Sequence, residues 1–220
     1  MFNKNYLKKW EEDKKKLIQN NIYREEDEHS SCGVGLIASI SGKASREVVE
    51  MSIQALGVLY HRGAVDADGK TGDGAGIQLG IPIDFFKEQI ERTGHKTNKL
   101  PFAVGMIFLP RTNFEAQEKS RIIIESEIIK EGFRIYGWRH VPINTKIIGD
   151  KAKSTLPEIE QILICNETYS NELQLDDKLY LVRKRIEKKI NQENINDFYI
   201  CSLSSQSIVY KGMFLAEQLS

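Results

Sequence analysis

Apolar residues recur along the chain with two spacings, one typical of amphipathic helices and the other typical of strands. Helical spacing predicts helices over residues 45–60, 83–92, 112–130 and 176–190. Short apolar or alternating runs predict strands over residues 32–40, 77–81, 103–109, 133–141, 158–165, 197–203 and 207–212. No internal repeat divides these elements, so residues from Cys32 onward are expected to form one domain or part of one.

Burial is predicted most strongly for the first strand and for one face of each helix. Residues 32–40 are expected to form a buried strand, in which Gly33 and Gly35 leave room for another backbone or a ligand. The other positions expected in the core include Phe85, Phe86, Ile90, Cys165, Leu179, Val182, Ile186 and Ile190. Residues 142–157 indicate an irregular crossover with about one helical turn, and residues 213–220 look like an interrupted continuation of the last strand.

Polar residues mark the expected helix ends. Ser45 can cap the helix that follows it, and Gly63 is the kind of residue that ends one. Thr112 and Glu115 have the spacing of a capping box, so we expect the next long helix to begin there. Asp176 and the aspartate after it can start the last helix.

The first 31 residues differ from the rest in being dense in charge and poor in apolar residues. Trp10, Leu17, Ile18 and Ile22 are loosely helical in spacing, so part of this segment is expected to be a helix. A partly ordered solvated tail and a removable pro-segment both explain this composition, and the sequence leaves the two open.

The composition is that of an ordinary soluble globular protein, and it limits the partners and the cellular location that we expect. The chain is 40% hydrophobic, and its 31 basic residues equal its 31 acidic ones, so no overall charge favours nucleic acid. The basic residues of helix 176–190 are read as a solvated face, because no aromatics are interleaved with them. No apolar run approaches the roughly 18 residues of a membrane helix, and no secretory signal is present. We therefore expect a cytoplasmic location, with a plastid or another organelle left open.

The three cysteines, Cys32, Cys165 and Cys201, do not form a metal-binding or disulfide pattern. Their odd number and the lack of any C-x-x-C pair favour a reducing compartment and no metal site.

A nucleotide-binding loop is also disfavoured by the sequence. Gly69-Lys70-Thr71 imitates the end of a phosphate-binding loop, but Ala64 stands where the earlier glycine is required, and the expected helix precedes the loop instead of following it.

Cys32 is the residue with the clearest chemistry, because it opens an apolar Gly-x-Gly run directly after the charged leader. Cleavage between Ser31 and Cys32 would give one residue both a thiol and a free α-amine. An α-amine has a reference pKa of roughly 7.7–8.0, so near neutral pH a fraction of it can accept the thiol proton. Cys32 is therefore a candidate nucleophile that carries its own base.

Several short motifs, taken together and in order, resemble the N-terminal amidotransferase domain of the glutamate synthase large-chain family. They are Cys32-Gly33-Val34-Gly35, His61-Arg62-Gly63-Ala64, Thr71-Gly72-Asp73-Gly74-Ala75-Gly76-Ile77, Ala103 to Pro110, Gly137-Trp138-Arg139, Arg183-Lys184-Arg185, Asp197 to Ser205 and Ile208 to Met213. The resemblance extends from about Ser31 to Leu219.

This resemblance implies an α+β fold, the four-layer αββα sandwich of N-terminal-nucleophile type II glutamine amidotransferases, incomplete at its C-terminal side. It makes residues 1–31 a leader or propeptide, and residues 32–220 the N-terminal portion of the amidotransferase domain. Cys32 becomes the glutaminase nucleophile. Arg62, next to Gly63, becomes a substrate-binding or nucleophile-supporting residue; an arginine that seals a helix C-terminus is the alternative left open. His61 is read as structural.

The resemblance also implies partners and cofactors. Glutamine is the expected substrate, and ammonia would pass to 2-oxoglutarate in synthase domains that carry FMN and an iron–sulfur cluster, with none of these cofactors held by the present residues. An NAD(P)H-oxidising small subunit or ferredoxin is the expected electron partner.

Two departures from the family stand out. Gln206 replaces a usual arginine, and the family's Arg-x-x-Thr-Asn-Thr element and oxyanion-forming Asn-Gly pair have no match here. These 220 residues alone are thus expected to be nearly inactive. A non-enzymatic fragment or partner-binding module, and another N-terminal-nucleophile amidohydrolase, are the alternatives.

Overall fold

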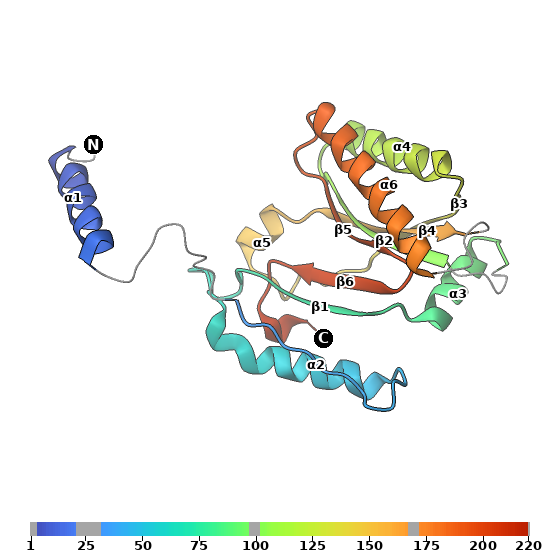
Figure 1. Cartoon of the computed structure of the whole chain (residues 1–220), viewed down its shortest axis with the longest axis horizontal. Coiled ribbons are helices and arrows are strands. Elements are labelled where there is room, and N and C mark those ends of the chain that lie inside the picture. The colour runs from blue at the N-terminus through green and yellow to red at the C-terminus, as the bar shows by residue number, and fades with distance from the viewer. Residues whose placement is uncertain (1–3, 21–31, 97–101, 167–171, 220) are drawn as a thin grey trace. The chain divides into compact units, whose positions relative to one another are not determined.

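The computed structural model describes residues 4–20, 32–96, 102–166 and 172–219 (Figure 1). It divides the chain into two compact units, Met1–Cys32 and Gly33–Ser220. The described part of the first unit is mainly one helix, α1 (Lys4–Asn20), which confirms the helix expected in this segment as far as Asn20. Ile22, the last residue of the predicted helical pattern, lies outside the described residues.

Within the described residues of the second unit, the strands form two antiparallel sheets (Figure 1). The larger sheet has the order β3-β4-β2-β5, and the smaller pairs β1 with β6. Their bounds are β1 Ala75–Gly80, β2 Phe102–Leu109, β3 Arg134–His140, β4 Glu158–Cys165, β5 Tyr199–Ser204 and β6 Ser207–Gly212. Six of the seven predicted strands are therefore confirmed, each with ends shifted by at most about two residues.

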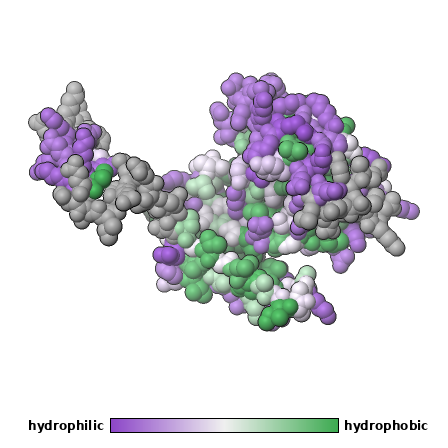
Figure 2. Space-filling view, in the orientation of Figure 1, coloured by the Kyte–Doolittle hydropathy of each residue, from purple (hydrophilic) through white to green (hydrophobic). Residues whose placement is uncertain are grey.

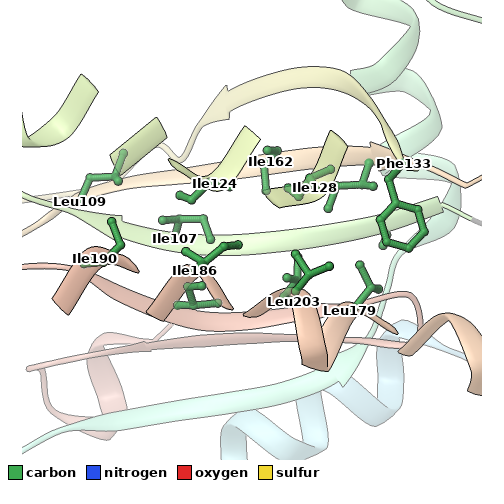
Figure 3. Packing of buried hydrophobic residues seen from close by; sticks show 14 of the residues in the cluster. Ile107, Leu109, Ile124, Ile128, Phe133, Ile162, Leu179, Ile186, Ile190 and Leu203 are labelled. Atoms are coloured by element: carbon green, nitrogen blue, oxygen red, sulfur yellow. The ribbon is translucent and has the colours of Figure 1, made fainter. Parts of the chain in front are cut away.

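One face of the larger sheet is covered by two long helices, α4 (Phe114–Lys130) and α6 (Glu172–Gln192), which lie side by side (Figures 1 and 3). The predicted inward positions of α6 are confirmed, since each is at most 1% exposed: Leu179, Val182, Ile186 and Ile190. They pack against alternate strand residues such as Ile107 and Ile162, as the strand period of two requires.

The opposite face of this sheet packs against β6 and the helix α3 (Ile83–Arg92). Phe86 and Ile90 of α3 are fully buried, as predicted, and Cys165 is a core thiol at 4% exposure. The prediction that Phe85 is also a core residue is wrong, because its ring is 39% exposed and lies under the guanidinium of Arg139 at 5.1 Å. Adjacent residues of a helix point in different directions, so only one of the two phenylalanines can face the core.

The helix α2 (Arg46–Val58) contacts β1 of the smaller sheet and continues as the 3-10 turn η1 (Leu59–Arg62). Ser45 is its N-cap, accepting a hydrogen bond from the Val48 amide at 3.4 Å, which confirms the predicted cap. The burial predicted for one face of this helix is wrong, because none of its residues is buried and its apolar side chains remain partly in solvent.

The predicted buried strand at residues 32–40 is wrong. This segment has no regular structure in the described part of the chain, and Val34, Leu36 and Ile40 are 91%, 92% and 108% exposed. A strand needs a neighbour to satisfy its backbone amides and cover its side chains, and no described strand pairs with this segment. Figure 2 shows apolar surface in the lower part of the view, where Figure 1 places α2.

The remaining element ends differ from the predictions for local reasons. The cap of α4 is Asn113, whose side chain accepts from the Ala116 amide, and Thr112 lies outside the helix. Helix α6 begins at Glu172, so the predicted start at Asp176 is wrong, and Asp176 accepts hydrogen bonds from the β5–β6 turn. The predicted single helical turn of the crossover is confirmed as α5 (Asp150–Ser154). The predicted strand continuation after residue 212 is wrong, since that segment holds the 3-10 turn η2 (Ala216–Gln218).

Candidate functional site

The turn η1 carries the His-Arg-Gly motif into a loop at the exposed end of α2. The ring of His61 is engaged locally, with Nδ1 lying 3.2 Å from the Val58 carbonyl oxygen, in keeping with a structural role. Arg62 is exposed, and its guanidinium makes no hydrogen bond or ion pair with any described residue. Gly63 closes the turn through its amide, which donates to the Tyr60 carbonyl at 3.2 Å. The charge of Arg62 is therefore available to an anionic group.

The loop that follows folds back on itself as a narrow hairpin. Val65 pairs with Gly72 in an antiparallel bridge, and the Asp66 amide donates to the Thr71 carbonyl at 2.9 Å. Gly69 sits at the tip with a φ of +67°, a conformation in which a residue with a side chain is strained. The hairpin thus returns the chain to the side of Gly63.

Asp68 occupies the inside of this hairpin and uses the amides that a phosphate loop would offer to an anion. Its carboxylate accepts from the amides of Lys70 and Thr71 at 2.9 and 2.7 Å, and from the Thr71 hydroxyl at 2.6 Å. These bonds, led by the Thr71 hydroxyl, hold the pKa of Asp68 far below its usual value. A carboxylate already fills the position of a phosphate, so the structure agrees with the sequence in disfavouring a nucleotide loop.

Two distant segments fix the hairpin in place. Lys151 of α5 forms an ion pair with Asp66 at 2.5 Å, and the Ala152 amide donates to the hydroxyl of the buried Thr71 at 3.3 Å. The side-chain amide of Gln218 donates to the carbonyls of Lys70 and Ile147, at 3.1 and 2.7 Å. The crossover and the end of the described chain therefore position the loop that carries the motif residues.

Asp73 is the residue that the sequence left without a role and that the structure places next to the motif. Its amide donates to the Ala64 carbonyl at 3.1 Å, and its carboxylate oxygen lies 3.3 Å from the point where a side chain on Gly63 would begin. A carboxylate and a guanidinium thus occur on neighbouring parts of one exposed loop. The signal was the polar residue inside the Gly72-Asp73-Gly74 run, but sequence spacing alone does not show the hairpin that brings it back.

The three thiols differ sharply in accessibility. Cys165 and Cys201 are buried, and burial raises the pKa of the Cys201 thiol, whereas Cys32 is exposed. Gly33, the residue after Cys32, packs against Leu59 at the start of η1. Cys32 itself belongs to the first compact unit, and Arg62 and Gly63 belong to the second. By access, Cys32 is the thiol suited to act as a nucleophile.

No helix among the described residues has the length and apolar character needed to cross a membrane.

The basic face of α6 is largely neutralised by neighbouring carboxylates. Arg183 pairs with Glu187 at 2.7 Å, and Arg185 pairs with Glu131 at 2.6 Å. This agrees with the interpretation of that face as a solvated, ion-paired surface.

Comparison with known proteins assigns the family. The model of the class-II glutamine amidotransferases matches residues 32–220, a range that begins at Cys32. The chain therefore belongs to the class-II glutamine amidotransferases.

Among curated proteins, the chain is 56% identical over 204 residues to the NADPH glutamate synthase large chain of Azospirillum brasilense. That match covers 93% of this chain and 14% of the relative. The ferredoxin-dependent glutamate synthase 1 of Arabidopsis thaliana is 40% identical over 194 residues, which is 87% of this chain and 12% of the relative. The NADPH glutamate synthase large chain of Bacillus subtilis is 38% identical over 199 residues, which is 90% of this chain and 13% of the relative.

These matches confirm the resemblance to the amidotransferase region of glutamate synthase large chains. They also show that the chain spans about one seventh of the length of the Azospirillum relative and less of the others named.

Proposed function

We propose that residues 32–220 form the N-terminal portion of a glutaminase domain, that Cys32 is its nucleophile, and that residues 1–31 are a propeptide. The observation that carries the proposal is that the family match begins at Cys32, directly after the charged leader. The exposure of Cys32 and the burial of the other two cysteines support it. So does the boundary between the two compact units, which falls next to this residue.

The finer fold that we propose is the αββα sandwich of N-terminal-nucleophile enzymes. Its support is the packing order of the second unit, in which α4 and α6 cover the larger sheet and the smaller sheet lies on its other face. The helix α2 contacts the smaller sheet through β1. The exposed, unpaired segment 33–40 has the composition of a strand for such a sheet.

In the proposed reaction the Cys32 α-amine takes the thiol proton, and the thiolate attacks the side-chain amide carbon of glutamine. The tetrahedral intermediate collapses as the C–N bond breaks, and the ammonium of Cys32 gives its proton to the departing nitrogen, which leaves as ammonia. The product on the enzyme is a γ-glutamyl thioester. Water, deprotonated by the same amine, then attacks the thioester and releases glutamate with the thiol restored.

Arg62 is proposed to hold a carboxylate of the substrate or to favour the thiolate of Cys32. Its exposed guanidinium, without a partner among the described residues, supports either role better than that of a helix seal. Gly63 is proposed to support this site by its lack of a side chain. A methyl group there would lie 3.3 Å from the Asp73 carboxylate oxygen, so close that this oxygen would have to shift by a few tenths of an ångström.

For the complete protein we propose glutamate formation from 2-oxoglutarate with the released ammonia. FMN and an iron–sulfur cluster would lie in domains outside these residues, and an NAD(P)H-oxidising subunit or ferredoxin would supply electrons. The names of the relatives support this reading, since they include NADPH and ferredoxin-dependent glutamate synthases. We further propose a cytoplasmic location. The proposed substrate is glutamine, and neither nucleic acid nor a membrane is a proposed partner.

The nucleophile is tested by expressing the complete reading frame and measuring intact mass, glutaminase activity and labelling by a glutamine-analogue affinity reagent. We expect loss of residues 1–31, label on Cys32, and a fall in glutaminase rate of about 10³-fold or more in Cys32→Ser. Cys201→Ser, which alters a buried thiol, is the matched control and should keep both label and activity. An unprocessed Met1 terminus together with an unlabelled Cys32 would refute the proposal.

The two roles of Arg62 are separable in the same protein with Arg62→Gln and the charge-conserving Arg62→Lys. If Arg62 binds a substrate carboxylate, the KM for glutamine rises while alkylation of Cys32 by uncharged iodoacetamide keeps its rate. If Arg62 favours the thiolate, the alkylation rate falls and its pH dependence shifts upward. Unchanged kinetics in both assays would show that Arg62 is structural.

A further inference from the structure

A cluster of metal-ligating side chains lies on the larger sheet, in the described part of the chain, on strands β3 and β4. His140 at the end of the edge strand β3 is the direct register partner of Glu160 on β4. Glu158 lies two residues before Glu160 and therefore on the same face. One ligand atom from each of the three residues lies within 4.8 Å of the other two.

The cluster is accessible on one side and held firmly on the other. The imidazole of His140 is 62% exposed, whereas the carboxylates of Glu158 and Glu160 are 24% and 12% exposed. Glu160 is oriented by Arg121 of α4, whose Nε and Nη2 donate to its two oxygens at 2.9 and 2.6 Å. A fixed carboxylate with an oriented second shell is the usual support of a protein metal ligand.

The charges around the cluster favour a cation. Arg121 pairs with Glu118 as well as Glu160, and Glu158 adds a third carboxylate to the cluster. These three carboxylates and one guanidinium carry a net charge of −2, leaving His140 out of the count. Each oxygen of Glu160 retains a further lone pair beyond its bond to Arg121. The Nδ1 atom of His140 lies 2.6 Å from a carboxylate oxygen of Glu158.

We propose that His140, Glu158 and Glu160 bind a divalent transition-metal ion of the zinc type, with water completing the coordination. An imidazole with two carboxylates suits zinc better than magnesium or calcium, which prefer oxygen ligands alone. Bonds of about 2.1 Å in tetrahedral geometry place ligand atoms about 3.4 Å apart. His140 and Glu158 must separate by less than about 1 Å to reach that spacing, which the exposed end of β3 permits. The bound ion links the edge strand β3 to β4. This structural role does not depend on the proposed glutaminase function.

The test is calorimetric titration of the 220-residue chain with Zn²⁺, in a Cys32→Ser background that removes the exposed thiol. We expect one saturable site, and a loss of affinity of at least about tenfold in both His140→Ala and Glu158→Gln. His61→Ala and Glu88→Gln are the matched controls, and they should bind zinc as the parent does. Saturating zinc should also raise the thermal midpoint of the parent but not of His140→Ala.

A second readout does not depend on how stable the variants are. Co²⁺ bound to the parent should give the absorption of a tetrahedral site, which excess Zn²⁺ abolishes and excess Mg²⁺ does not. Two results would overturn the proposal: no saturable zinc binding by the parent, or binding that survives both ligand substitutions. In either case the contact between His140 and Glu158 would be only a side-chain pair between neighbouring strands.

Discussion

At the scale of single residues, the buried carboxylate of Glu127 on α4 stands out for the number of cations around it. It is 3% exposed and lies among three cations, Lys130, Arg185 and Lys189, two of which come from α6. The hydrogen bond from Lys189 is the largest cause that lowers the pKa of Glu127 below its ordinary value of 4.5. The ionised carboxylate of Glu127 is therefore more stable in the folded protein than in the unfolded chain.

This lowered pKa sets the sign of a pH effect. Because the unfolded chain takes up a proton at Glu127 more readily, stability from this group is full above about pH 4.5 and disappears as pH falls through the lower, folded pKa. Glu127→Gln should reduce the free energy of unfolding at neutral pH by about 1–2 kcal/mol and flatten its decline in acid. Chemical unfolding at several pH values measures both, with the exposed Glu88→Gln as control. A variant with an unchanged acid slope would contradict this account.

Gly149 shows how a single hydrogen in place of a side chain can support the candidate site. A methyl group there would overlap the carboxylate of Asp68 and the hydroxyl of Thr71, the groups that shape the hairpin beside Arg62. Gly149→Ala should therefore destabilise the protein by about 1–3 kcal/mol. Gly35→Ala, which has open space around it, should change stability by less than about 0.5 kcal/mol. Equal midpoints for the two variants in a thermal melt would refute the packing argument.

At the scale of elements, the sequence predicts what local chemistry decides and misses what distant partners decide. The cap at Ser45 and the buried stripe of α6 depend on neighbours within a turn or two, so both are predicted correctly. The segment 32–40 has the composition of a strand, but a strand forms only where another strand pairs with it. The approach of Asp73 to Gly63 depends on a hairpin fixed by α5 and η2, which spacing along the chain cannot reveal.

A single carboxylate of helix α6 holds the turn between β5 and β6 in place. Asp176 of α6 accepts from the Ser205 amide and hydroxyl at 2.7 and 2.8 Å, and from the Ser204 hydroxyl at 2.7 Å. Asp176→Asn should cost about 1–2 kcal/mol, because three donors then meet a neutral group with a single acceptor oxygen. The neighbouring exposed Asp177→Asn is the control and should be nearly neutral. Urea unfolding compares the two, and an equal loss in both would exclude a specific role for Asp176.

At the scale of the second unit as a whole, apolar surface is concentrated at its N-terminal end. The most exposed large apolar residues there are Val34, Leu36, Ile40, Val58 and Tyr60. Figure 2 shows apolar surface over the lower part of the view, where Figure 1 places α2. The larger sheet, by contrast, is covered on both faces. A contiguous apolar surface of this kind marks an interaction site or an aggregation hazard. Stability should accordingly be uneven, high around the larger sheet and low in residues 33–40.

The 220-residue chain should therefore bind a hydrophobic dye in its folded state, through the segment 33–40 and the adjoining face of α2. The double substitution Leu36→Ser and Ile40→Ser should lower dye fluorescence by about twofold, since both side chains are almost wholly in solvent and contribute little to folding. Ile122→Ser, which alters an exposed residue of α4 outside this segment, should leave the fluorescence unchanged. Backbone amides of residues 33–40 should exchange with deuterium nearly as fast as in a free peptide, whereas those of β2 should be protected. Slow exchange in residues 33–40, or dye binding that the double substitution does not reduce, would mean that this segment is covered.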